Sequence, residues 1–150
     1  MKQRRTPYYW LSLAALAALM GVIFYLSAQE ATDSASGSMW LTLLLRKLTG
    51  LPLTDSLVRT FAHGAEFAAL GFWMLHVLNA RFRALRPFAA TALAWLFAWT
   101  DEAHQIFVPG RAFEFSDVAT DLAGILVGAA FGTLLVLAAR AVRRKRKNEV

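Results

Sequence analysis

Four long apolar stretches dominate the pattern of the chain. Residues 8–27 carry no charged side chain, and the stretches at 59–79, 88–108 and 117–139 are interrupted by only a few polar positions. About twenty helical residues, rising ~1.5 Å each, cover the ~30 Å hydrocarbon core of a bilayer. The pattern therefore predicts four membrane-spanning helices at these ranges.

The first apolar stretch has a second interpretation, because Lys2, Arg4 and Arg5 precede it as they would precede a secretory signal sequence. The stretch is long for a signal sequence. Large side chains, Tyr25 and Leu26, also stand where cleavage would favour small ones. A retained span is the preferred interpretation, and cleavage would leave the remaining topology unchanged.

The segment after the first span is mixed in character. Residues 29–38 are polar and typical of a turn. Residues 39–48 are apolar but too short to span a bilayer. With Trp40, Arg46 and Lys47, they predict a helix that lies in the membrane interface.

The expected fold is an all-α integral membrane bundle of four transmembrane helices, with the short interfacial helix in the first outer loop. We expect a single domain over residues 1–150 that ends in a basic cytoplasmic tail at 140–150. Gly124, Gly128 and Gly132 recur every four residues, a spacing that lets membrane helices approach closely.

Composition supports this class. Hydrophobic residues make up 57% of the 150 residues, against about 45–50% in soluble domains. This excludes soluble, disordered and collagen-like classes. The chain has no cysteine, so disulfides, thiolate metal ligands and a thiol nucleophile are excluded.

The net charge of +6 is distributed unevenly. Both ends and the segment between the second and third spans hold twelve of the sixteen basic residues and one of the ten acidic ones. That side therefore carries +11, and the other side −5. The asymmetry predicts a multi-pass protein of the bacterial cytoplasmic membrane with both termini in the cytoplasm. The basic segments are interpreted as anchors to membrane lipid and not as a nucleic-acid-binding surface. His76, near the inner end of the second span, is expected at the interface.

Ionisable residues gather in the outer third of three predicted spans. Arg59, His63 and Glu66 follow i, i+4, i+7 spacing and share one helical face. Glu66 lies ~10 Å below Arg59, and Asp101 lies ~10 Å below Val108. A charge at the bilayer centre costs ~2.5–3.5 kcal/mol. We therefore expect these groups to face one another, water or a ligand.

The residue types suggest several kinds of chemistry. A guanidinium suits bidentate contact with phosphate. Histidines and carboxylates suit proton transfer or binding of a divalent metal, and the spacing does not choose between these. The candidates for proton transfer or catalysis are His63, Glu66, Asp101, Glu102 and His104, and those for ligand binding are Arg59, Gln105, Arg111, Asp117 and Asp121.

A structural network is the alternative interpretation of the same residues. His63 would bridge to Glu66 or Asp101, and Arg111 would pair with an acidic residue at the start of the last span. Interhelical polar pairs in membranes contribute only ~0.6 kcal/mol on average. A lock therefore explains any one pair, whereas a functional pocket better explains the whole set.

Several blocks carry a family resemblance. Ser27 and Gln29 follow the first span. The other blocks are R-x-x-x-H-x-x-E-F-x-x-L-G from Arg59, D-E-x-H-Q-x-F-x-P-G-R from Asp101, and S-D-V-x-x-D-x-x-G-x-x-x-G from Ser116. With these blocks, nearly the whole chain resembles the VanZ-like family of bacterial membrane proteins.

The resemblance implies a small multi-span protein of the cell envelope. The family takes its name from a protein associated with low-level resistance to the glycopeptide teicoplanin. This chain departs from the family pattern at two positions. Gly64 stands where members commonly have an aromatic residue, and Asp121 where they commonly have Asn. The added carboxylate leaves the role of that position open.

Three functional hypotheses follow. In the first, the outer pocket recognises or acts on a phosphate- or sugar-bearing envelope lipid, with a link to glycopeptide tolerance. Whether the protein is an enzyme stays open, as does a divalent metal cofactor. In the second, the protein is a non-enzymatic scaffold or regulator, as a homo-oligomer or with an envelope enzyme as partner. In the third, it is a proton- or ion-coupled transporter.

Overall fold

The computed structural model describes residues 6–149, and this part of the chain is all-helical. Lys2, Arg4 and Arg5, which contribute to the predicted orientation, lie outside the described residues. The helices are α1 (Pro7–Ser27), α2 (Ala31–Thr49), α3 (Asp55–Phe82), α4 (Pro87–Gln105) and α5 (Phe115–Asn148).

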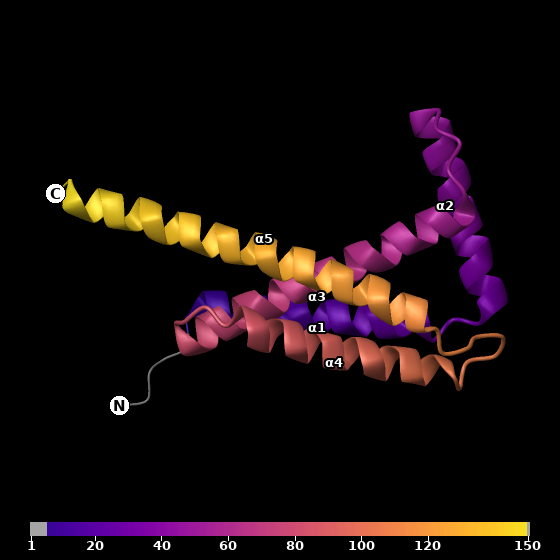
Figure 1. Ribbon diagram of the computed structural model, residues 1–150, viewed down its shortest axis with the longest axis horizontal. Coiled ribbons are helices and arrows are strands. Elements are labelled where there is room, and N and C mark those ends of the chain that lie inside the picture. The colour runs from indigo at the N-terminus through magenta and orange to yellow at the C-terminus, as the bar shows by residue number, and fades with distance from the viewer. Residues whose placement is uncertain (1–5, 150) are drawn as a thin grey trace.

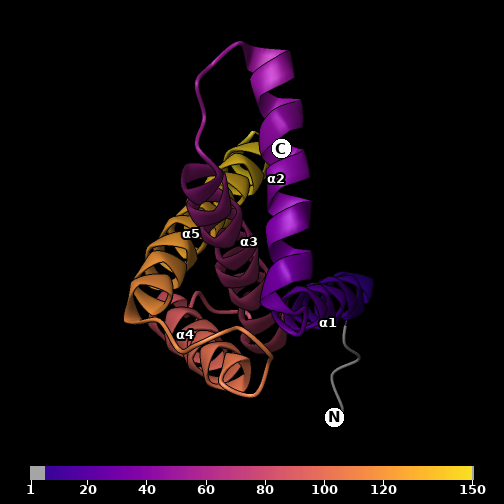
Figure 2. The same cartoon turned by 90° about the vertical axis from the view of Figure 1, so that its right-hand side faces the viewer.

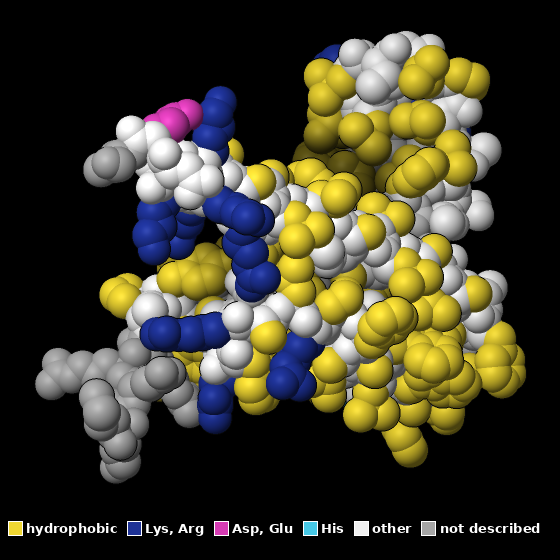
Figure 3. All heavy atoms as spheres, turned by 60° about the vertical axis from the view of Figure 1, so that its left-hand side comes forward, with side chains coloured by type: hydrophobic (Ala, Val, Ile, Leu, Met, Phe, Trp, Pro, Cys, Tyr) yellow, Lys and Arg dark blue, Asp and Glu magenta, His cyan; other side chains and the backbone are white. Residues whose placement is uncertain are grey.

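Helices α1, α3, α4 and α5 form an elongated bundle, and α2 projects steeply from one end of it (Figures 1 and 2). The start of α1 and the end of α5 lie at the opposite end. Lys and Arg side chains gather there, while much of the neighbouring surface is apolar (Figure 3).

Two helices within the described residues are long and apolar enough to cross a membrane. The most apolar window has a mean hydropathy of 2.0 in α1 and 2.3 in α5. Helices α3 and α4 do not qualify, and they are the helices that carry Arg59, His63, Glu66, Asp101 and Glu102. The all-helical prediction is confirmed, whereas the four-span bundle stays a prediction.

Local signals explain most helix boundaries. Pro7 and Pro87 occupy the first turns of α1 and α4, where a missing N–H removes no hydrogen bond. Thr54 caps α3 by accepting a hydrogen bond from the Leu57 N–H at 3.2 Å. Gly50 ends α2 in the left-handed conformation at φ 70°, which glycine adopts without a Cβ penalty.

The predicted turn at residues 29–38 is wrong, because α2 begins at Ala31 and is a helix of 19 residues. The hydroxyls of Ser36 and Ser38 donate to carbonyls one turn earlier, at 2.8 and 3.1 Å. Asp33 stands in the first turn, where the helix dipole favours an acid. These polar residues therefore support the start of a helix instead of interrupting one.

Two other boundaries also differ from the prediction. Helix α4 ends at Gln105, because the N–H groups of Phe107 and Val108 donate to carbonyls only three residues back. Gly110 then turns the chain with φ 75°. At the other end, α5 continues as a helix through the basic tail to Asn148.

The closest packing in the bundle joins α3 to α5. A Cβ added to Gly124 would collide with the carbonyl oxygen of Gly64, and one added to Gly128 would collide with that of Ala68. Gly71 meets the backbone of Ile125 in the same way. The predicted close approach through small residues is confirmed, and it lets the two backbones touch.

The contact of α4 with the rest of the bundle also uses small residues. Ala90, Ala94 and Ala98 are spaced one turn apart and fully buried. Together with Phe67 of α3 and Ile23 of α1, they form part of one apolar core. The polar ends of α3 and α4 are thereby held side by side.

Gly128→Ala tests the backbone contact, with Gly21→Ala as its control. The methyl group at position 128 must displace the Ala68 carbonyl, and such overpacking costs about 1–3 kcal/mol. A Cβ at Gly21 has no neighbour within 4 Å. We expect a lower midpoint of thermal unfolding in detergent for Gly128→Ala only. Equal midpoints for the two variants would refute the backbone contact.

Candidate functional site

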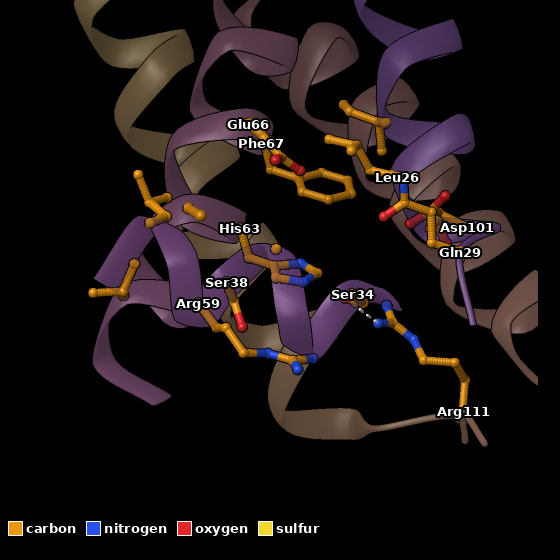
Figure 4. Close-up of a pocket in the computed structure, with 16 residues that line it drawn as sticks. Leu26, Gln29, Ser34, Ser38, Arg59, His63, Glu66, Phe67, Asp101 and Arg111 are labelled. Carbon is orange, nitrogen blue, oxygen red and sulfur yellow. Dashed lines mark hydrogen bonds between the residues drawn. The ribbon is translucent and has the colours of Figure 1, made fainter. Parts of the chain in front are cut away.

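A cavity of about 210 Å³ opens at the end of the bundle where α2 projects (Figure 4). We call it the polar cavity. It brings together five of the ten predicted site residues, which come from α3, α4 and the segment before α5: Arg59, His63, Glu66, Asp101 and Arg111.

The remaining lining of the polar cavity is partly polar and partly apolar. Gln29, Ser34 and Ser38 contribute polar groups from the start of α2 and the residues before it. Apolar side chains of α1 and α3, among them Leu26 and Phe67, form another part of the wall. Sequence reasoning missed the two serines, because residues 29–38 were interpreted as a turn.

Arg111 is held in place by hydrogen bonds from two sides. Its Nε donates to Gln105 Oε1 at 3.3 Å, and its Nη1 donates to Ser34 Oγ at 3.0 Å. Gln105, which is buried, also donates through Nε2 to Ser27 Oγ at 3.2 Å. This chain of hydrogen bonds links α1, α4, the segment before α5 and α2. Arg111 does not form the predicted ion pair with Asp117 or Asp121.

Arg59 is the second cation of the polar cavity. Its guanidinium makes no hydrogen bond or ion pair with any residue that the structure describes, and the side chain is half-buried. Figure 4 shows the guanidinium groups of Arg59 and Arg111 reaching toward the cavity from opposite sides. Two guanidinium groups therefore face the polar cavity. That of Arg111 is held by hydrogen bonds, and that of Arg59 is not.

His63 lies next to Asp121, a partner that was not predicted from the sequence. The two side chains approach to 3.7 Å between Nδ1 and Oδ1, and Asp121 is buried. Asp121 lies one turn before Gly124, so the close α3–α5 contact brings its carboxylate to the histidine. The expected bridge from His63 to Glu66 or Asp101 is replaced by this interhelical pair.

The two carboxylates of the polar cavity have few protein partners, and Ser27 offers a side-chain hydrogen bond to Asp101. Asp101 is buried, and its Oδ1 has no hydrogen-bond partner within residues 6–149. Glu66 is half-buried and accepts no hydrogen bond from the described part of the chain. Because α4 ends at Gln105, Asp101 lies ~6 Å from the helix end instead of the ~10 Å expected below Val108.

Glu102 faces away from the polar cavity and has a structural role. Its Oε1 accepts a hydrogen bond at 2.7 Å from the backbone N–H of Glu114, the residue that caps α5. Glu114 provides no side-chain cap of its own to that helix. Glu102 therefore supplies, from α4, an acceptor for the unpaired N–H groups at the start of α5.

The last two predicted residues also lie outside the polar cavity. The ring of His104 packs on Phe24, with ring centroids 4.5 Å apart. Asp117 lines a separate open cleft of about 380 Å³, together with Asp55 and Glu114. Arg59 and His63 border both spaces.

A divalent metal was left open by the sequence. Within residues 6–149, no group of three or more His, Asp or Glu side chains is arranged to hold a metal ion.

The sequence blocks that supply these residues were compared with known families and structures. The model of the VanZ/LLP1 family matches residues 12–137. The chain belongs to this family. Membership of the VanZ/LLP1 family, with two helices apolar enough to span a bilayer, identifies a membrane protein of the envelope. The searches of curated proteins and of solved structures returned no match.

Variants of this VanZ/LLP1 protein can separate locking residues from cavity residues. Glu102→Ala leaves the Glu114 N–H without its acceptor, which costs about 1–3 kcal/mol. We expect a clear fall in the thermal unfolding midpoint, and a smaller fall for Glu102→Gln, which keeps an acceptor oxygen. Glu66→Ala removes no hydrogen bond and should leave the midpoint unchanged or raise it. Equal losses for Glu66→Ala and Glu102→Ala would contradict this division.

Proposed function

We propose that this VanZ/LLP1 protein recognises the headgroup of a phosphate-bearing envelope lipid in the polar cavity. The observation that supports it best is the presence, in one cavity, of two guanidinium groups, from Arg59 and Arg111, and two carboxylates, one of which has a buried oxygen without a hydrogen-bond partner in the described chain. Guanidinium groups bind phosphate in a bidentate way, and no residue within 6–149 pairs with Arg59 and would compete.

The two carboxylates indicate which other chemical groups the headgroup should carry. A buried acceptor without a donor costs about 1–3 kcal/mol, and Asp101 Oδ1 is such an acceptor. A ligand that supplies a hydroxyl or an ammonium group would remove this penalty. The preferred headgroup therefore carries a phosphate for the arginines and a hydroxyl or amine, as in a sugar phosphate, for Asp101 and Glu66.

The size and lining of the polar cavity favour a lipid as the carrier of that headgroup. Its volume of about 210 Å³ is below the ~300–1,000 Å³ of pockets for drug-sized ligands, so a small headgroup fits better than a large soluble substrate. Leu26 and Phe67 in its wall offer contact to the apolar part of the same molecule.

His63 gives the polar cavity a group that could move a proton. Its buried partner Asp121 would orient the ring. Action on the bound lipid would thus be acid–base chemistry by His63, with recognition as the first step. Binding of an envelope lipid also offers a route by which the protein would influence tolerance to teicoplanin.

The proposal includes an orientation. We place the polar cavity at the outer leaflet, with α1, α3, α4 and α5 crossing the membrane and both termini in the cytoplasm. The positive-inside rule supports this, because the basic residues gather at the end opposite the polar cavity (Figure 3).

A scaffold for an envelope enzyme is the second candidate. It is favoured by the number of predicted site residues that hold helices together instead of facing the polar cavity. Glu102 fixes the start of α5, and Gln105 connects Ser27 to Arg111. In a scaffold, substitutions in the polar cavity would reduce the amount of protein or of captured partner.

Binding of farnesyl phosphate and farnesol to the purified protein tests recognition. Arg59→Ala removes a charged phosphate contact and should weaken farnesyl phosphate binding about tenfold to a hundredfold, while farnesol binding stays unchanged. Lys47→Ala, which removes a charge from the same end outside the polar cavity, should behave as wild type. Equal losses for the two variants would show that general attraction, and not the polar cavity, binds the phosphate.

A deletion strain tests the function in cells. Wild-type protein should restore the profile of envelope lipids and cell-wall precursors, measured by mass spectrometry. Asp101→Asn should insert at the same level without restoring the profile, because it loses the cavity carboxylate. Full restoration by Asp101→Asn would refute a binding role for Asp101 and favour the scaffold.

A further inference from the structure

A second and larger cavity lies at the opposite end of the bundle. It has a volume of about 610 Å³ and is enclosed by the start of α1, the end of α3 and the C-terminal part of α5. We call it the basic cavity, after its three arginines: Arg83, Arg140 and Arg143. Figure 3 shows Lys and Arg side chains surrounding this end of the molecule.

The positive charge of the basic cavity is not neutralised by its walls. No Asp or Glu is present among the described residues that line it. Arg140 Nη2 donates to the neutral side chain of Asn79 at 2.8 Å. The nearby acid, Glu149, pairs with Lys145 at 4.0 Å. Two elements thus direct uncompensated guanidinium groups at one space.

Arg83 occupies an unusual backbone position at the rim. It ends α3 with φ 53°, and no other non-glycine residue in the described chain has a positive φ. Glycine is the usual residue at such a helix end, and other L-residues are disfavoured there by about 1–2 kcal/mol. A cation is therefore present where the backbone alone would favour glycine.

The inner wall of the basic cavity carries polar groups that are neutral or titratable. The Tyr8 hydroxyl is hydrogen-bonded to His76 Nδ1, and both residues line the cavity. The His76 side chain, expected at the level of the interface, is only 8% exposed, with the rings of Phe72 and Trp73 beside it. His76 Nε2 has no hydrogen-bond partner within residues 6–149.

The level of the basic cavity matches the boundary between hydrocarbon and headgroups. The apolar part of α1 begins at Pro7, and the long apolar part of α5 ends at Ala139, where the charged positions begin with Arg140. Leu135, Val136 and Ala139 form its apolar side. In a membrane protein, this combination places cations at headgroup level above an apolar wall.

We propose that the basic cavity binds the anionic headgroup of a membrane glycerophospholipid, with Arg83, Arg140 and Arg143 around its phosphodiester. Basic pockets between membrane helices are suited to such headgroups, and guanidinium groups match the phosphate geometry. Tyr8 and Asn79 offer hydrogen bonds to glycerol oxygens. This inference is independent of the function proposed for the polar cavity, because it uses no residue of that site.

Short-chain dihexanoyl-phosphatidylglycerol provides the probe, with dihexanoyl-phosphatidylcholine as the uncharged comparison. Binding to the full-length protein in a non-ionic detergent is measured by native mass spectrometry and by the shift of the thermal unfolding midpoint. Glycerol 3-phosphate in a competition arm separates a lipid headgroup from a free phosphate compound. We expect binding of phosphatidylglycerol, no shift with phosphatidylcholine, and no competition at equal concentration.

Two triple variants with equal loss of charge locate the site. Arg83→Gln/Arg140→Gln/Arg143→Gln should weaken phosphatidylglycerol binding on the order of a hundredfold, since each cation contributes separately. Its fold is checked by the thermal unfolding midpoint in detergent without added lipid, which should stay close to that of wild type. The control triple replaces three basic residues of α5 that do not line the basic cavity, Arg144, Lys145 and Arg146, with Gln. It should lose less than about fivefold.

The outcomes are decisive in both directions. Selective loss in the Arg83/Arg140/Arg143 triple supports the basic cavity as the lipid site. Equal loss in both triples would overturn it in favour of diffuse attraction to the basic tail. Equal binding of phosphatidylcholine would overturn the requirement for an anion. Full competition by glycerol 3-phosphate would overturn the lipid in favour of a soluble phosphate compound. If the site triple unfolds at a clearly lower temperature, Arg140→Gln alone replaces it in the same comparison.

Discussion

The backbone contact between α3 and α5 is the constraint on which the rest of the structure depends. It exists because Gly124 and Gly128 leave no side chain between the carbonyls of Gly64 and Ala68 and the opposing helix. His63 precedes Gly64, and Asp121 lies one turn before Gly124. The approach of the Asp121 carboxylate to His63 is therefore a consequence of how closely two backbones pack, and side-chain reach alone would not produce it.

Asp101 and Glu102 are consecutive residues of α4, but they serve different purposes. Successive residues of a helix point about 100° apart. Asp101 consequently faces the polar cavity, while Glu102 reaches the start of α5. The Asp101 carboxylate keeps an oxygen without a hydrogen-bond partner in the described chain, whereas the Glu102 carboxylate holds the start of α5 in place. Both side chains are buried, so burial does not separate their roles, whereas their hydrogen-bond partners do.

Much of the fold could be predicted from hydrophobic spacing, since long apolar runs and the Gly124–Gly128 interval follow directly from residue types. The start of α2 could not. Its Ser36 and Ser38 favour turns in isolation. In the helix, their hydroxyls donate to its own carbonyls, and the Ala31 N–H, at the start of the helix, donates to the Pro109 carbonyl. The convergence of His63, Glu66 and Asp101 was predictable from depth. The partners of His63 and Arg111 required knowledge of which helices touch.

The polar residues within α3 also affect how such a chain would be assembled during synthesis. On its own, α3 does not meet the apolarity of a spanning helix, whereas α5 does. Yet α5, which follows α3 and α4 along the chain, supplies the backbone that packs on Gly64 and Ala68 and the carboxylate that approaches His63. If α3 crosses the bilayer, its polar groups must stay partly unpaired, at the translocon or beside α1, until α5 has been made. In that case, the order of the helices along the chain couples the completion of α3 to the synthesis of α5.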